Sequence, residues 1–133
     1  MGSDIYSADW TEQTYQELAR RADALLGQGR RVLVDASFRR DQRRRQFFDL
    51  ARRLSVPALV LECRADPAVV RSRLQQRHGD ASDADWAVYQ LTAGEWEPAS
   101  HPVSKRHHLV DSGAALATAL RQAEAILRHA GLL

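Results

Sequence analysis

The fold is decided by two apolar runs, Arg31-Val32-Leu33-Val34-Asp35-Ala36 and Ala58-Leu59-Val60-Leu61-Glu62-Cys63. Neither run alternates polar and apolar residues, so each is typical of a strand that is buried on both faces of a parallel sheet. A third run, His107-His108-Leu109-Val110-Asp111, predicts a further short strand. These three runs are the expected strands of one sheet.

Helical periodicity fills the intervals between these strands. A first helix is predicted from about residue 9 to 27, with a capping box in which Asp9 accepts from backbone N–H groups and Glu12 reaches back. Gly27 and Gly29 are expected to end it. The other expected elements are helices at 40–54, from Asp66-Pro67 onward and from 116 to about 131, a short helix from Ser82 after a break at Gly79-Asp80, and a loop at 92–106. Strands that alternate with helices predict right-handed crossovers and an α/β layered sandwich with a short parallel sheet flanked by helices.

The composition fits a single domain that spans residues 1–133. Hydrophobic residues make up 44% and charged residues 27%, and no apolar run approaches the ~20 residues that cross a bilayer. The first residues show no secretory signal. Cys63 is the only cysteine, which excludes an internal disulfide and suits a reducing compartment, so the expected location is a bacterial cytoplasm.

The basic residues are nearly all arginine. The formal net charge is only +2, which is too small for strong attraction to nucleic acid or a membrane. Lys105 is the only lysine, and the arginine guanidinium is planar and matches phosphate and carboxylate. The most basic segment, Arg39–Arg45, either contacts a phosphorylated substrate or an RNA backbone or forms a solvated helix face. No aromatic residue is interleaved within it, which favours the solvated face.

Ligands of open α/β sheets bind beyond the carboxyl ends of the strands. Residues 35–38, 63–66 and 111–113 are expected there. Asp35 lies at or just inside the end of an apolar run, where an ionised carboxylate needs a partner or a metal. Either it is a magnesium-associated acid of a phosphotransferase, or it caps the next helix or pairs with Arg39 or Arg40.

A pair of arginines marks the third predicted helix. Arg73 and Arg77 stand four residues apart and share one face, whereas Arg71 lies on a different side. Two guanidinium groups on one face can hold a phosphate. The alternative is a solvated face with surface ion pairs worth about 0–1 kcal/mol each, and the spacing alone favours this alternative.

The histidines and the cysteine predict neither a metal site nor a nucleophile. His107 and His108 are adjacent, so on a strand they point to opposite faces. Cys63 has no second cysteine or paired histidine motif and is expected to be buried and inert. Ser112 lacks the glycine-flanked elbow of an α/β-hydrolase nucleophile.

Several short motifs carry a resemblance through their order and spacing. They are Tyr6–Glu12 through Tyr15, Gly29–Phe38, Leu61–Ala65, Val70–Arg77 and Ser82–Asp85. Over about residues 5–130 the chain resembles the P-loop kinases related to polynucleotide kinase and zeta toxin, especially ATP-binding domains fused to aminoglycoside-phosphotransferase-like proteins. The resemblance implies a three-layer α/β sandwich, with ATP and magnesium as the phosphate donor.

The same resemblance implies roles for four residues. Asp35 would be a catalytic and metal-binding residue beside the magnesium and the transferred phosphate. Arg73 and Arg77 would lie in or beside a mobile lid and neutralise charge on the phosphoryl group, and Ser37 would join them in nucleotide binding. The expected ligand is therefore a nucleotide or a phosphorylated small molecule.

The sequence departs from this family at one motif. The 133 residues contain no Gly-x-x-x-x-Gly-Lys-Ser/Thr, the loop whose backbone cradles phosphates and whose lysine and hydroxyl hold phosphate and magnesium. The expected architecture is therefore an incomplete P-loop NTPase fold. This chain alone is expected to bind ATP weakly at most and to show almost no catalysis.

The missing loop also has an expected structural consequence. In the complete fold the strand before the loop lies between residues 31–36 and 57–63. Unpaired strand edges are costly when buried and adhesive when exposed, so these two runs are expected either to pair directly or to receive another chain, with a homodimer as one form. The alternative function is then a non-catalytic interaction module that dimerises through its edges or recruits a partner through Arg39–Arg45. A nucleic-acid accessory role is less favoured.

Overall fold

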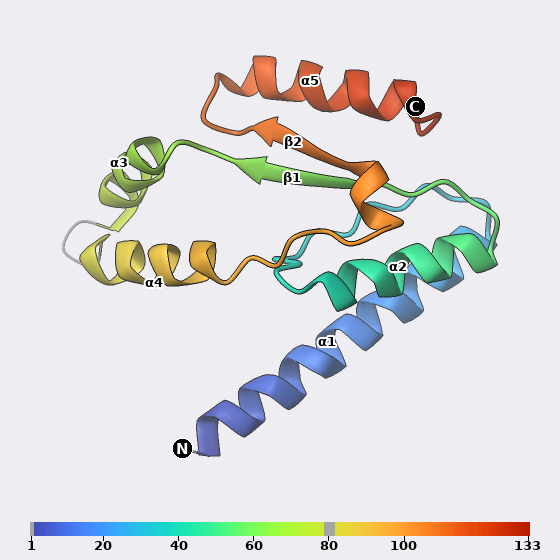
Figure 1. Ribbon diagram of the computed structural model, residues 1–133, viewed down its shortest axis with the longest axis horizontal. Coiled ribbons are helices and arrows are strands. Elements are labelled where there is room, and N and C mark those ends of the chain that lie inside the picture. The colour runs from blue at the N-terminus through green and yellow to red at the C-terminus, as the bar shows by residue number, and fades with distance from the viewer. Residues whose placement is uncertain (1, 79–81) are drawn as a thin grey trace.

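The computed structural model describes residues 2–78 and 82–133. These residues form five α-helices, a short 3-10 helix η2 and a two-stranded parallel sheet. In chain order the elements are α1 (Gly2–Gly27), α2 (Asp41–Arg53), β1 (Val60–Arg64), α3 (Pro67–His78), α4 (Ser82–Gly94), η2 (Val103–Arg106), β2 (His107–Asp111) and α5 (Leu116–His129). In Figure 1, α5 runs along one side of the sheet, while α2 and then α1 lie on the other. The predicted α/β class, with a short parallel sheet flanked by helices, is confirmed.

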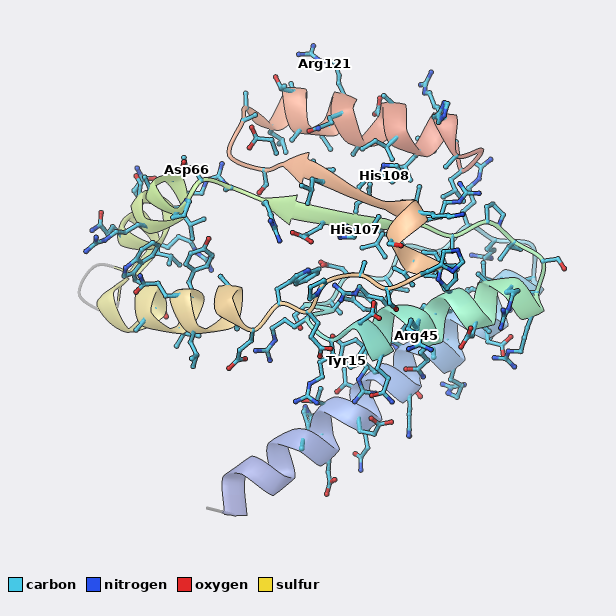
Figure 2. The ribbon with its side chains drawn as sticks, in the orientation of Figure 1. Tyr15, Arg45, Asp66, His107, His108 and Arg121 are labelled. Carbon is cyan, nitrogen blue, oxygen red and sulfur yellow. The ribbon has the colours of Figure 1, made fainter. Side chains whose placement is uncertain are left out.

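The two strands pair in register along their whole length. Val60 lies opposite His107 and Arg64 lies opposite Asp111. Because side chains alternate along a strand, Glu62 and His107 share one face of the sheet, and His108 lies on the other. Figure 2 shows His108 on the α5 side and His107 on the opposite side. The prediction that the two histidines point apart is confirmed.

The prediction of a buried strand at residues 31–36 is wrong. No strand pairs with this segment among the described residues, and the Leu33 side chain is 89% exposed. A strand needs a neighbour that receives its N–H and C=O groups, and the part of the chain that the structure describes supplies none here. Direct pairing of this segment with β1, one of the two expected arrangements, does not occur.

The N-terminal boundary of the first helix also differs. Helix α1 begins at Gly2, so Asp9 lies inside the helix and does not cap it. Glu12 does not accept from the backbone N–H of Asp9 as a capping box requires. It accepts a hydrogen bond from Gln16 (3.1 Å) and forms an ion pair with Arg43 on α2. The predicted end at Gly27 is confirmed, and Gly29 turns the chain with a φ of 78°.

The other boundaries agree to within a few residues. Ala68 N–H donates to the Asp66 carboxylate (2.9 Å), which confirms the predicted cap of α3. Strand β1 is shifted toward Arg64, and α4 continues to Gly94, into the expected loop. The break predicted at Gly79-Asp80 lies outside the described residues.

Few apolar side chains are buried among the residues whose burial the structure describes. The buried apolar residues are Tyr15, Ala22, Leu50 and Ala51 on α1 and α2, with Val103 on η2 and Val110 on β2. Helix α5 has no buried residue. None of the helices in the described part of the chain is long and apolar enough to cross a membrane.

Candidate phosphate-binding site

The end of the extended segment is fixed to helix α1 by one tyrosine. Tyr15 is only 6% exposed, and its hydroxyl accepts a hydrogen bond from Phe38 N–H (3.0 Å) and lies 3.4 Å from Ser37 Oγ. Phe38 adopts a positive φ of 46°, an uncommon conformation for a bulky residue. Its ring packs edge-on against Tyr15 and Phe47, with centroids 5.4 Å away in both cases. These contacts hold the turn and place Ser37 beside α1.

A cavity of about 570 Å³ opens next to this turn. Its walls come from α1, from the turn that leads into α2, and from the segment after α4. The lining residues are Ala8, Thr11, Tyr15, Ser37, Arg39, Arg40, Arg43, Glu95 and Glu97. Three guanidinium groups and several hydroxyls therefore surround one space, a combination that suits a phosphate group.

Two of the three arginines already have partners. Arg39 pairs with Glu95 (2.8 Å). The Arg43 guanidinium lies 5.0 Å from the centre of the Tyr15 ring and pairs with Glu12, and the hydrogen bond from Arg43 lowers the pKa of Glu12 below its ordinary value. Arg40 is exposed, and its side chain has no hydrogen-bond or ion-pair partner among the described residues. Arg40 is therefore the guanidinium that a bound anion can engage without breaking an existing pair.

Asp35 lies two residues before Ser37. It is exposed, and it has no hydrogen bond or ion pair within the described part of the chain. Neither of the ordinary structural roles considered for Asp35, a helix cap or a pair with Arg39 or Arg40, is observed. A carboxylate without a partner and a neighbouring hydroxyl are ligand types that Mg²⁺ accepts. Ser37 lines the cavity, and Asp35 is not among its lining residues. No cluster of three or more metal-ligating side chains occurs in residues 2–78 and 82–133.

Arg73 and Arg77 lie elsewhere. Both are exposed on α3, which packs against α4, and neither lines the cavity. Arg71 on the same helix stacks over Trp86 of α4 at 5.3 Å, consistent with its predicted separation from the other two. In Figure 2, Asp66, directly before α3, lies at the upper left of the view, whereas Tyr15 lies near its centre. The structure thus brings Ser37 into the cavity and keeps the α3 arginines apart from it.

Two of the three expected strand ends meet. Ser112 N–H donates to Arg64 C=O (2.8 Å), so residues 63–66 and 111–113 lie side by side. Residues 35–38 instead contact α1. Cys63 is exposed, so the expectation of a buried thiol is wrong.

The solvated-face interpretation of Arg39–Arg45 is wrong for Arg44. Arg44 is 1% exposed; it donates to Glu97 C=O and lies 4.5 Å from the centre of the Trp96 ring. Its Nη2 lies 3.6 Å from Asp41, and its Nε and Nη1 have no hydrogen-bond partner among the described residues. This arginine supports the wall of the cavity that Glu97 provides.

A second buried polar contact lies on the sheet. His107 Nε2 is 3.0 Å from Glu62 Oε1, and Glu62 also pairs with Arg64. The His107 ring lies 6.3 Å from Trp96. The sequence did not predict this contact or the roles of Tyr15, Arg44 and Trp96. Each of these contacts joins segments that are distant along the chain.

Comparisons with known proteins give one family. A family model described as an AAA domain matches residues 1–96. That range includes Asp35, Ser37, Arg73, Arg77 and the cavity lining from Ala8 to Glu95. The comparisons with curated proteins and with solved structures gave no match.

Proposed function

Because the chain belongs to the AAA domain family, we propose that it is a nucleotide-binding domain of the P-loop kinase type, descended from an ATP-dependent phosphotransferase. The observation that carries this proposal is the cavity beside Ser37, which Arg39, Arg40 and Arg43 line. The Arg40 guanidinium has no partner among the described residues, so it is available to a phosphate. The ligand class is a nucleotide or another phosphorylated small molecule.

The side-chain chemistry of each site residue suits it to a different role in binding. Arg40 and the Ser37 hydroxyl bind phosphate oxygens in the cavity, because guanidinium and hydroxyl groups donate charge-assisted hydrogen bonds. Asp35 holds Mg²⁺ through its carboxylate. The magnesium, when bound, neutralises charge on the phosphates. Arg73 and Arg77 approach the phosphates only if α3 and α4 move, as the proposed lid role requires.

Binding by these 133 residues is weak in this proposal. The sequence has no Gly-x-x-x-x-Gly-Lys-Ser/Thr, and its only lysine, Lys105, lies on η2. The backbone cradle that supplies most phosphate contacts in P-loop proteins is therefore not part of this sequence. Phosphoryl transfer stimulated by ATP in the chain alone would contradict the proposal, because it would show that the loop is dispensable.

Calorimetric titration with ATP and Mg²⁺ tests the proposal. We expect millimolar affinity that weakens by about tenfold or more in Arg40→Ala, since a charge-assisted hydrogen bond contributes about 1.5–3 kcal/mol. Arg53→Ala is the matched control, because Arg53 is also exposed but lies in the last turn of α2 and does not line the cavity.

Inorganic tripolyphosphate is the second ligand in this experiment. Equal weakening of ATP and tripolyphosphate binding in Arg40→Ala would support phosphate recognition at the cavity. No detectable heat with either ligand, or the same affinity in Arg40→Ala and Arg53→Ala, would contradict it.

A further inference from the structure

The chain exposes far more surface than its mass predicts. Its accessible surface is 9755 Å² for 15.0 kDa, whereas a compact monomer of that mass exposes about 7,000 Å². The excess of about 2,700 Å² exceeds the ~800 Å² that each partner buries in a typical stable interface. Large apolar side chains contribute to this surface, with Leu33, Leu116 and Trp10 the most exposed. The chain therefore has surface to bury against a partner.

The extended segment 31–36 has no neighbouring strand in the described part of the chain. It has the composition of a strand and the most exposed large apolar side chain among the described residues, Leu33 at 89%. No backbone hydrogen bond joins it to another segment in the described part of the chain. An extended segment with free N–H and C=O groups is a template for pairing with another strand.

The sheet has two edges, and only one of them is covered. At the outer edge of β2, the Gln122 side chain accepts from Asp111 N–H (3.0 Å) and donates to Leu109 C=O (3.4 Å). This amide occupies the place of a neighbouring strand, so β2 cannot readily add another one there.

The edge of β1 is open. Arg64 C=O accepts from Ser112 N–H, so Arg64 and, two residues back, Glu62 direct their backbone groups toward β2. The backbone groups of Leu61 and Cys63 therefore point to the opposite edge, since they alternate along a strand. No described residue pairs with that edge.

We propose that a second copy of this chain fills the open edge of β1 with its own segment 31–36. The exchange is reciprocal and two-fold symmetric, so each copy gives one segment and receives one. Segment 31–36 and β1 run in the same direction in one copy (Figure 1), as a crossover through α2 requires. A two-fold axis then makes the two central segments antiparallel to each other and each antiparallel to the β1 strand that it joins.

The product is a continuous six-stranded sheet. Its order is β2, β1, the partner's segment 31–36, the chain's own segment 31–36, then β1 and β2 of the partner. Each open edge receives a strand, and both outer edges keep the Gln122 cover. A second copy fits better than an unrelated partner because the chain carries both complementary elements, and a two-fold interface satisfies both at once. This inference does not depend on the proposed nucleotide site.

Sedimentation equilibrium and hydrogen exchange test the dimer. We expect twice the mass of the chain at micromolar concentration and slow exchange at the amides of Leu61 and Cys63, which point to the open edge. Dilution to the monomer should speed exchange at these two amides at least tenfold. Asp111 N–H, which donates to Gln122 in each copy, should not change.

Two matched variants locate the interface. Leu33→Asp should weaken dimerisation about 100-fold or more, because the carboxylate would be buried without a partner in the dimer, while the exposed position tolerates it in the monomer. Leu116→Asp is the control, since Leu116 is 75% exposed at the start of α5, which packs on β2 and not on the open edge of β1.

Three results would overturn the inference. One is a monomer at every concentration up to millimolar. Another is a dimer that Leu33→Asp leaves intact, or one whose Leu61 and Cys63 amides exchange freely. The third is a monomer in which those amides become protected only after an apolar synthetic peptide is added, which would assign the edge to a different polypeptide.

Discussion

Two helices of this molecule are rich in arginine but lie in different surroundings. Helix α2 carries Arg43, Arg44 and Arg45 near its start, and helix α3 carries Arg71, Arg73 and Arg77. In α2, Arg44 is buried beneath Trp96, and the Arg43 side chain is only 15% exposed. In α3, all three arginines are exposed. Residue type and helical spacing alone therefore did not decide which guanidinium became part of the core.

The difference comes from what each helix faces. Helix α2 packs against α1 and η2, and the segment from Glu95 to Ser100 supplies a carbonyl, an aromatic ring and a hydroxyl to its polar residues. Helix α3 contacts mainly α4. An arginine becomes buried only where a distant segment provides partners for its guanidinium, because an unpaired buried charge is strongly unfavourable.

The largest expected effect comes from removing the buried guanidinium. Arg44→Ala should lower the free energy of unfolding by about 3 kcal/mol, since it leaves Asp41 without its ion-pair partner and a void under Trp96. Urea denaturation measures the change. Arg45→Ala, one position along and exposed, should change it by less than about 0.5 kcal/mol. Equal effects of the two substitutions would remove the contrast between buried and exposed arginines on α2.

A smaller effect on the free energy of unfolding is expected at Asp41, which pairs with Arg44. Burial alone would raise the pKa of Asp41, but hydrogen bonds from the Ser100 hydroxyl and N–H, with the charges of Arg44 and Arg45, outweigh it and lower that pKa. The unfolded chain then binds this proton at higher pH than the folded chain, so the free energy of unfolding should fall as pH drops below about 4.

Asp41→Asn isolates this contribution. The variant should lose about 1–2 kcal/mol near neutral pH, where a charge-assisted hydrogen bond is weakened, and the acid-side slope should become flatter. Urea denaturation at several pH values between 3 and 7 measures both. An unchanged slope in the variant would show that Asp41 does not contribute to the acid dependence.

The smallest effect on stability is expected on α3. Arg73→Ala/Arg77→Ala should change the free energy of unfolding by less than about 0.5 kcal/mol, because both side chains are exposed. Under the proposed function the same double variant should weaken binding of ATP with Mg²⁺, measured by calorimetry. Unchanged affinity would remove α3 from the nucleotide site, whereas a large loss of stability would show that its arginines have a structural role.

The family resemblance and the local patterns predicted much of the chain. Helices α2, α3 and α5, strands β1 and β2, and the cap at Asp66 follow from apolar periodicity and turn residues close together in sequence. The cavity was not predictable in the same way. Ser37 was identified, but Tyr15, Arg43 and Glu95 come from three separate segments and become neighbours only when α1, α2 and the segment after α4 pack together.

By itself the sequence determined the α/β class, the position of most helices and strands, and membership of the family, because these depend on local periodicity and on motif order. Tertiary structure decided that residues 31–36 lie unpaired among the described residues, that Arg44 is buried while Arg73 and Arg77 are exposed, and that Ser37 lies in a cavity lined by arginines. The physical reason is that strand pairing and the burial of charge require partners from distant parts of the chain, and local sequence does not specify where those partners will be.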